Sequence, residues 1–180
     1  IPNVTEGNYF LVLTNDFVNY VNELNETNNS LSIPILIANL DLVVTNVTVP
    51  ATADSQSVIP VIWEIKNQGL GTAYPTWRDR VYISTNATYE TNDTFLGEFS
   101  QTQPIGSGSN YLATNFVSVP GFTAGNYFII VRTDTATNLF EANRTNNILA
   151  APINLAAPDL AVVQVNTLTN VASQQALNIT

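Results

Sequence analysis

Apolar and polar residues alternate along much of this chain, and no segment keeps the period of 3.6 residues that is typical of a helix. The clearest alternation is in residues 58–66, where Val61, Trp63 and Ile65 fall on one face and the residues between them fall on the other. A period of two places successive side chains on opposite faces of a strand. The pattern therefore predicts a half-buried β-strand in this stretch.

Five further segments are rich in aromatic and β-branched residues and predict additional strands. They are residues 40–44, 80–84, 95–99, 111–119 and 127–133. Residues that favour turns separate these segments, at positions 67–69, 71, 92–93, 106–108 and 120–121. About seven short strands in about 118 residues predict an all-β fold, an Ig-like antiparallel β-sandwich. We expect Trp63 and Trp77 to lie in its core.

The sequence repeats itself, without a gap, at an offset of 118 residues. Gly-Asn-Tyr-Phe at 7–10 recurs at 125–128, and Glu-x-Asn-x-Thr-Asn-Asn at 23–29 recurs at 141–147. Shorter matches at the same offset are Pro34-Ile35 with Pro152-Ile153, Asp41-Leu42 with Asp159-Leu160, and Ser55-Gln56 with Ser173-Gln174. A repeat of this length indicates similar modules arranged in tandem.

The repeat predicts three parts. Residues 1–38 correspond to the closing strands of a preceding module, residues 39–156 to one complete module, and residues 157–180 to the opening strands of a following one. The first and last parts do not complete each other, because both lack the stretch equivalent to 72–119. No signal peptide is visible. We expect the chain to be a segment of a longer array of such modules.

Several motifs of the middle module occur together in one known family. They are Asp41-Leu42-Val43-Val44, Trp63-Glu64-Ile65-Lys66-Asn67-Gln68-Gly69, Trp77-Arg78-Asp79-Arg80-Val81-Tyr82-Ile83-Ser84-Thr85, Leu96-Gly97, Gly125-Asn126-Tyr127 and Glu141-x-Asn143-x-Thr145-Asn146-Asn147. On these motifs, residues 39–156 resemble CARDB, the cell-adhesion-related domain found in bacteria and archaea. The resemblance implies an Ig-like sandwich, usually in tandem on large secreted or surface proteins. It implies adhesion or scaffolding only loosely, and no reaction.

Composition narrows the classes of partner. Only 11% of the residues are charged, and Asn and Thr take surface positions that Lys and Glu usually fill. The net charge is −9 and Lys66 is the only lysine, so the clustered cations that nucleic acid requires are missing. An anionic membrane would repel the chain, and no apolar run approaches the ~18 residues of a membrane span. The acidity is explained most simply by solubility, with repulsion between neighbours and cation binding as alternatives.

Catalysis has few candidate residues. The chain contains no His and no Cys, which removes the usual general base near neutral pH, the Ser-His-Asp and Cys-His arrangements, thiolate zinc sites and disulfides. Paired carboxylates, which glycosidases use, remain. The candidates are Glu64, Glu90, Asp93, Glu98, Asp134 and Glu141. A sandwich of this size offers no evident deep cleft to raise the pKa of one of them, so we predict that the chain is not an enzyme.

The N-glycosylation motif occurs eight times, where about four occurrences are expected by chance in a chain so rich in Asn and Thr. The asparagines are Asn3, Asn25, Asn28, Asn46, Asn86, Asn92, Asn143 and Asn178. Asn25 and Asn143 are equivalent in the repeat. The alternative is that Asn and Thr only fill turns and exposed strand faces. We expect covalent N-glycans at several of these sites, on loops and strand ends.

Calcium is the only cofactor that the sequence suggests. The loop at 86–93 contains Glu90 and Asp93, two carboxylates of the kind that calcium prefers. Asn86 and Asn92 could add neutral ligands, but both lie in glycosylation motifs. The alternative is a solvated turn.

Other polar residues have simpler structural interpretations. We expect the element at 141–147 to fix the bend between the last two strands through bonds from side-chain amides to nearby backbone groups. Asp41 and Asp159 each open a module, where we expect them to cap the junction or to bind a cation. Asp79, between Arg78 and Arg80, is expected to form an ion pair within the sheet.

Together these observations predict a non-enzymatic structural module of a secreted or cell-surface glycoprotein or extracellular fibril. Its expected partners are other copies of the same module, in a tandem array or homopolymer, and glycans. Donation of a strand between copies is one variant of that assembly. The alternative is an adhesin module that binds a carbohydrate or protein through its loops, with or without calcium.

Overall fold

The computed structural model describes residues 4–141, 143–166, 170, 172–174 and 176. These residues form ten strands and one short 3-10 helix, η1, at Glu26–Asn28. The strands are β1 Gly7–Thr14, β2 Ser30–Ile37, β3 Leu42–Thr48, β4 Thr52–Asp54, β5 Val58–Asn67, β6 Arg78–Ser84, β7 Thr94–Ser100, β8 Asn110–Ser118, β9 Gly125–Arg132 and β10 Ile148–Ala156. No helix among the described residues is long and apolar enough to cross a membrane.

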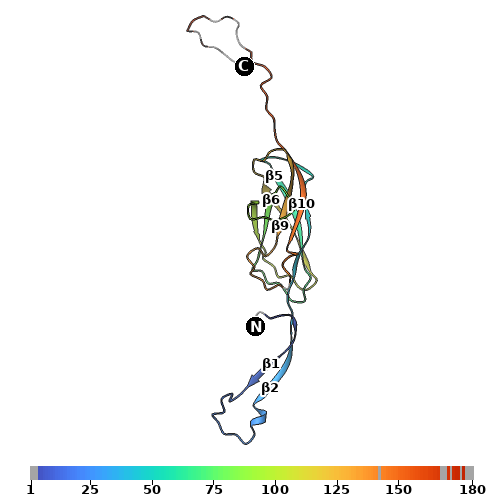
Figure 1. The fold of residues 1–180 in the computed structure, drawn as a ribbon, viewed down its shortest axis with the longest axis vertical. Coiled ribbons are helices and arrows are strands. Elements are labelled where there is room, and N and C mark those ends of the chain that lie inside the picture. Colours follow the sequence, from blue (N-terminus) through green and yellow to red (C-terminus); the bar gives the residue numbers. More distant parts are fainter. Residues whose placement is uncertain (1–3, 142, 167–169, 171, 175, 177–180) are drawn as a thin grey trace.

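Strands β3 to β10 form a two-layer sandwich (Figure 1). One sheet has the order β4-β10-β9-β6-β7 and the other the order β3-β5-β8. Neighbouring strands are antiparallel except β10 and β4, which run parallel. The predicted all-β, Ig-like sandwich is confirmed, and its eight strands fit the expected number roughly.

The core lies between the two sheets and follows from the alternation of apolar residues. Val61, Trp63 and Ile65 of β5 are completely buried, as the period of two predicted. They face apolar side chains from β6 and β9, among them Val81 and Ile129, in one continuous cluster. Trp77 is also buried, so both tryptophans are core residues as expected.

The strand boundaries differ from the predictions in two places. β3 extends to Thr48, and Leu40 contributes only an isolated bridge to Glu141. Asn67 ends β5 instead of opening a turn, because its buried side chain donates to the carbonyl oxygens of Gly71, at 2.7 Å, and Ile105, at 3.0 Å. The segments predicted from composition did not include the short β4 or β10.

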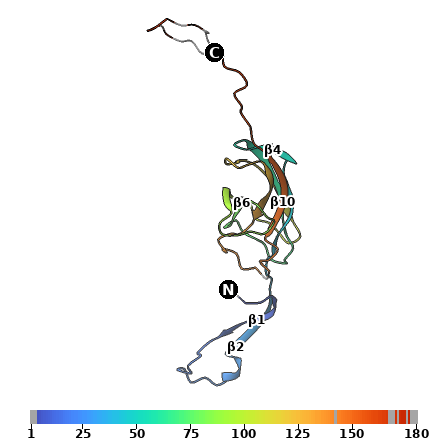
Figure 2. The ribbon, with the colours of Figure 1, turned by 45° about the horizontal axis from the view of Figure 1, so that its top comes forward.

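Strands β1 and β2 form a separate two-stranded sheet that projects from one end of the sandwich (Figures 1 and 2). Residues 157–166 leave the sandwich at the opposite end, after β10 (Figure 1). The chain therefore enters the sandwich at one end and leaves it at the other.

The β1–β2 hairpin has the same internal geometry as the β9–β10 hairpin. Gly7 pairs with Ile37, as Gly125 pairs with Leu155 at the equivalent register position. In both hairpins an aspartate with positive φ follows the first strand by two residues, with φ of 40° at Asp16 and 43° at Asp134.

The turn hydrogen bonds are repeated as well. Asp16 Oδ1 accepts the backbone N–H of Tyr20 at 2.8 Å, and Asp134 Oδ1 accepts that of Asn138 at 2.9 Å. Each hairpin also closes with a backbone bond between equivalent residues, from 15 to 29 in one and from 133 to 147 in the other. The local structure of the two hairpins is therefore the same.

Their surroundings are different. In β9, Ile129 and Val131 are fully buried beneath the opposite sheet. The equivalent residues of β1, Leu11 and Leu13, are 57% and 72% exposed. The β1–β2 hairpin therefore presents to solvent the apolar face that β9–β10 buries.

Candidate functional site

A cluster of polar side chains joins the first strand of the sandwich to the loop before its last strand. We call Asp41, Glu141, Asn146 and Asn147 the junction cluster. The Glu141 carboxylate accepts the backbone N–H of Leu42 at 2.8 Å and the side-chain amide of Asn147 at 2.9 Å. Asp41 Oδ1 accepts the Asn146 amide at 3.0 Å. The expected role of the 141–147 element, to fix this bend, therefore extends to the start of the module.

Two glycines make room for the segment that enters the sandwich. A Cβ at Gly69 would lie 2.5 Å from the carbonyl oxygen of Asn39, and a Cβ at Gly71 would lie 2.5 Å from that of Ala38. Backbone atoms cannot move aside as a flexible side chain can. These two positions therefore require glycine if residues 38–41 are to keep this path against the end of β5.

Burial shapes the electrostatics of the junction cluster. It raises the pKa of Glu141 to about 7, while hydrogen bonds from the Leu42 N–H and the Asn147 amide act in the opposite direction. The nearby charge of Asp134 also raises this pKa, and Arg144 lowers it. Arg144 Nη1 lies 2.8 Å from Asp134 Oδ2 and 3.7 Å from Glu141 Oε1, so one guanidinium serves both carboxylates.

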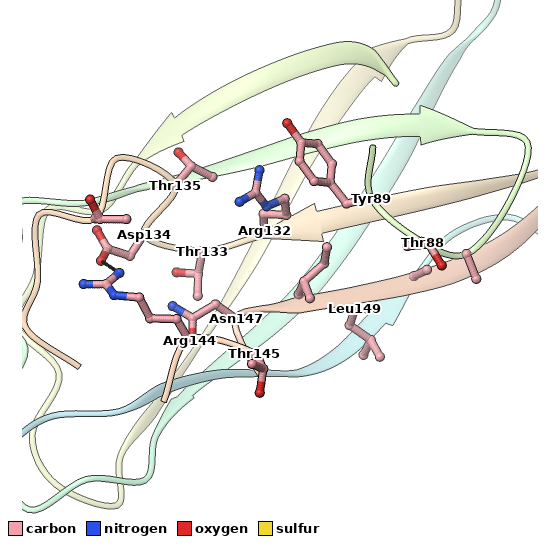
Figure 3. Close-up of a pocket in the computed structure, with 14 residues that line it drawn as sticks. Thr88, Tyr89, Arg132, Thr133, Asp134, Thr135, Arg144, Thr145, Asn147 and Leu149 are labelled. Carbon is pink, nitrogen blue, oxygen red and sulfur yellow. Dashed lines mark hydrogen bonds and ion pairs between the residues drawn. The ribbon is translucent and has the colours of Figure 1, made fainter. Parts of the chain in front are cut away.

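A pocket of about 600 Å³ lies beside this cluster, between the β6–β7 loop and the ends of β9 and β10 (Figure 3). The guanidinium of Arg132 lies 3.9 Å from the centre of the Tyr89 ring. The Arg144–Asp134 pair lies at the other side of the pocket (Figure 3). Much of the remaining lining is threonine, at positions 88, 133, 135, 137 and 145.

Asp134 is the only carboxylate among the described residues that line the pocket. Asp134 uses its carboxylate to accept the N–H groups of Asn138 and Leu139, and it pairs with Arg144. Arg132 forms no ion pair among the described residues, so its cation remains free to meet a ligand. An arginine stacked on an aromatic ring and surrounded by hydroxyl groups suits an anionic or polyhydroxylated ligand.

Of the six carboxylates considered for catalysis, Asp134 and Glu141 lie on either side of Arg144, and Glu90 and Asp93 lie together in one turn. The roles of Arg132, Tyr89 and Arg144 were not predicted from the sequence. A signal was available, because Arg132 and Arg144 are two of only five basic residues in the chain.

The prediction for Asp79 was wrong. Its side chain points into the core, where it accepts the indole N–H of Trp63 at 2.8 Å and the hydroxyl of Tyr111. Burial raises the pKa of Asp79, and these hydrogen bonds oppose the rise. Arg78 and Arg80 lie on the outer face and pair with Glu98 of β7. Alternation along β6 explains the outcome, since residue 79 faces opposite to its two neighbours.

The predicted glycosylation sites in the described residues lie at the surface. Asn25, Asn28, Asn46, Asn92 and Asn143 are exposed and Asn86 is half-buried. Asn3 and Asn178 lie outside the described residues. Asn25 and Asn143 adopt the same turn, in which Oδ1 accepts both the N–H and the hydroxyl of the threonine two residues later.

The two predicted calcium ligands, Glu90 and Asp93, lie in one tight turn. Asp93 Oδ2 accepts the N–H of Glu90 at 2.7 Å, and the carbonyl oxygen of Glu90 accepts the N–H of Asp93 at 3.1 Å. Within the described part of the chain, no three acidic, His or Cys side chains gather as a metal site would require. Calcium at these residues stays a prediction.

Comparison with known proteins gives the family. The CARDB family model matches residues 39–151, which include strands β3 to β9 and the first four residues of β10. This chain belongs to the CARDB family. CARDB is a non-catalytic module related to cell adhesion. No curated protein matches the chain.

Two solved structures share the CARDB fold. The crystal structure of the CARDB domain of the PF1109 protein from Pyrococcus furiosus, in complex with di-metal ions, is 21% identical to this chain with a TM-score of 0.52. The match covers 67% of this chain and 96% of that one. The solution NMR structure of the same domain is 22% identical, with a TM-score of 0.51 and coverage of 66% and 96%.

Proposed function

We propose that this chain is a non-enzymatic structural repeat of a secreted, N-glycosylated surface protein or extracellular fibril, in which CARDB modules follow one another in tandem. The observation that carries the proposal is the β1–β2 hairpin. It has the register and the turn hydrogen bonds of β9–β10, but no second sheet of the described residues packs over its apolar face as the β3-β5-β8 sheet packs over β9 and β10. A hairpin of this kind is the closing part of a preceding module.

The path of the chain supports a linear assembly. The hairpin projects from one end of the sandwich, and residues 157–166 leave from the other (Figure 1). Contacts between different surfaces at opposite ends repeat from unit to unit, and they form an open filament when the rotation between units does not close a ring. Other copies of the module are therefore its main partners.

The surface fits an extracellular location. Asn46 lies on the edge strand β3, and Asn92 lies two residues before the edge strand β7. Glycans at these positions would protect one open edge of each sheet from unwanted pairing with other strands. The net charge of −9 adds repulsion between neighbouring filaments and gives no basis for binding nucleic acid.

Two measurements test this proposal on material from the native source. Negative-stain electron microscopy should show filaments, and discrete particles of one module would contradict the fibre. Intact mass before and after enzymatic removal of N-glycans should show a loss corresponding to several glycans. An unchanged mass would contradict the glycosylation.

The pocket favours a second function, that of an adhesin module which binds an acidic carbohydrate. Its support is the free Arg132 cation stacked on Tyr89. On a glycan array, Arg132→Ala should lose any binding that the deglycosylated chain shows. Arg78→Ala, outside the pocket and on the outer face, is the matched control. If EDTA abolishes binding, calcium takes part; equal binding by both variants would exclude this pocket.

A further inference from the structure

Two N-glycosylation motifs border the pocket beside the junction cluster, one on each of the two loops at its edge. The β6–β7 loop contains the motif at 86–88, and the β9–β10 loop contains the motif at 143–145. The second and third residues of both motifs line the pocket, and Thr88, Arg144 and Thr145 are seen at its edge (Figure 3). None of the other motifs within the described residues contributes to this lining. The attachment points of two predicted glycans therefore lie beside one cavity.

The side chain of Asn143 is in contact with the pocket wall. Its Oδ1 accepts the backbone N–H of Thr145 at 3.0 Å and the Thr145 hydroxyl at 2.8 Å. Both bonds use the oxygen, so the amide nitrogen, to which a glycan is attached, forms no hydrogen bond among the described residues. Asn143 is exposed, whereas Asn86 is half-buried. Asn143 is therefore the better placed of the two to carry a glycan.

The pocket wall offers groups that bind an acidic sugar. Its volume of about 600 Å³ lies in the range of ordinary small-molecule sites. Arg132, stacked on Tyr89, is a cation without an ion-pair partner in the described part of the chain. Asn147 Oδ1 and Thr135 Oγ1, from two lining residues, are buried and have no hydrogen-bond partner there. Sugar hydroxyls donate and accept hydrogen bonds, and a sugar carboxylate matches the planar fork of a guanidinium.

We propose that this pocket holds an acidic sugar of the N-glycan on Asn143 of the same chain. Arg132 binds the carboxylate of the sugar, while Asn147 and the threonines of the wall bind its hydroxyl groups. This inference rests on the glycosylation proposed above and names the occupant of the pocket. The glycan then closes the pocket to outside ligands, so the adhesin function is confined to chains that lack a glycan at this position.

Attachment at the edge of the pocket favours this occupant over a free carbohydrate. Asn143 lies two residues from Thr145, at most about 7 Å along the chain. A ligand on so short a link has an effective concentration on the order of millimolar. Weak contacts are then enough to keep the pocket filled. The net charge of −9 also disfavours the capture of a free anion from solution.

The equivalent turn in the repeat provides an internal standard. Asn25 adopts the same turn as Asn143 and also lies in a glycosylation motif. The two arginines of the pocket, however, are replaced at the equivalent positions by Thr14 and Glu26. This position therefore does not offer an acidic sugar the same pair of cations, and a glycan on Asn25 should not respond to changes in the pocket.

Arginine-specific labelling tests whether the pocket is filled. The chain, expressed with its native glycosylation, is treated with phenylglyoxal, and modification of Arg132 is followed by peptide mass spectrometry. Asn143→Asp removes the glycan but retains the oxygen that Thr145 bonds. It should make Arg132 react at least about threefold faster, because a tethered sugar no longer competes with the reagent. Asn92→Asp, with the same change of charge outside the pocket, should leave the rate unchanged.

Each alternative has its own outcome in this experiment. Unchanged labelling of Arg132 in Asn143→Asp, with glycopeptides that show an occupied Asn143 in wild type, would refute the docking and leave the proposed glycosylation intact. An unoccupied Asn143 would refute both at this site. Faster labelling in Asn86→Asp alone would assign the pocket to the other motif and overturn the proposal. Slow labelling of wild type made without glycans would also overturn it, because no sugar would then be needed to shield Arg132.

Trimming of the glycan gives the complementary measurement. Arg132→Gln removes the cation, and an exoglycosidase should then release the acidic sugar from the Asn143 glycan at least about threefold faster than in wild type. The Asn25 glycan of the same molecules calibrates the enzyme. Arg78→Gln, outside the pocket, is the matched control. Equal release from Asn143 in wild type and in both variants would contradict the docking, whatever the occupancy of the site.

Discussion

The β1–β2 and β9–β10 hairpins are nearly one structure in two environments. Their register, their left-handed aspartate and their turn hydrogen bonds agree residue for residue. Only β9–β10 has a second sheet over its apolar face and strands β4 and β6 at its edges. The comparison shows that the local sequence is enough to specify the hairpin, whereas its stability comes from distant strands. An isolated two-stranded sheet is marginal in water.

Removing a large side chain at equivalent positions of the two hairpins should show most strongly how much stability comes from packing against distant strands and how much from the hairpin itself. Ile129→Ala leaves a cavity in the core and should lower the free energy of unfolding by about 2–5 kcal/mol. Leu11→Ala, at the equivalent exposed position, should change it by less than about 0.5 kcal/mol in dilute solution. Urea unfolding followed by tryptophan fluorescence measures both, since Trp63 and Trp77 lie in the sandwich core.

The expected difference between the two hairpins would be contradicted if Leu11→Ala lowered the free energy of unfolding as much as Ile129→Ala does. That result would mean that the hairpin packs on the sandwich of its own chain. A loss for Leu11→Ala that grows with protein concentration would instead indicate docking between copies.

The pH dependence of stability should be the next largest effect. The pKa of Glu141 is raised from 4.5 to about 7, so between these values the folded chain holds a proton that the unfolded chain has released. The contribution of Glu141 to the free energy of unfolding therefore falls as pH rises from about 4.5 to 7, by on the order of 2 kcal/mol. Asp134 and Arg144 are the charged groups that face it.

Glu141→Gln should remove this slope, because an amide does not titrate. The difference between wild type and variant, measured by urea unfolding from pH 4.5 to 8, isolates Glu141 from the other carboxylates. Glu23→Gln makes the same charge change at the equivalent position of the hairpin and serves as the control. If the slope of Glu141→Gln equals that of wild type, another group causes the pH dependence.

Much of the fold was predictable because the sequence is periodic, both in its alternation of apolar and polar residues and in its 118-residue repeat. Alternation in residues 58–66 identifies the buried face of β5, and the 118-residue offset relates the sequences of the two hairpins. β4 was missed because three residues carry too little pattern. β10 was not selected by composition because Ala150, Ala151 and Pro152 interrupt its β-branched residues, although the bend expected at 141–147 implied a last strand after it.

The pocket was not predictable in the same way. Tyr89 lies in a loop, Arg132 ends β9 and Arg144 lies in the next loop, so only the folded chain brings them together. The Asp79 error has a related cause. Neighbouring charges suggested an ion pair, but the strand placed Asp79 beneath Trp63 and both arginines on the outer face. Charge patterns predict contacts poorly when the strand face is not taken into account.

The smallest expected difference concerns a hydrogen bond that both hairpins contain. The Tyr127 hydroxyl donates to the carbonyl oxygen of Thr123 at 3.2 Å, and the Tyr9 hydroxyl donates to that of Thr5 at 2.9 Å. Tyr127→Phe should lower the free energy of unfolding of the sandwich by about 0.5–1.5 kcal/mol, because Tyr127 is buried and the loss of its bond is not replaced by water.

Tyr9→Phe should leave the tryptophan-monitored unfolding midpoint unchanged, because its bond is exposed and lies outside the sandwich. Hydrogen exchange of β1 amides should still become faster by a factor of about 2 to 5, since a bond worth roughly 0.5–1 kcal/mol is lost locally. Equal midpoint shifts in the two variants would mean that hairpin and sandwich unfold as one unit. In that case the hairpin would draw its stability from the sandwich that follows it in the chain.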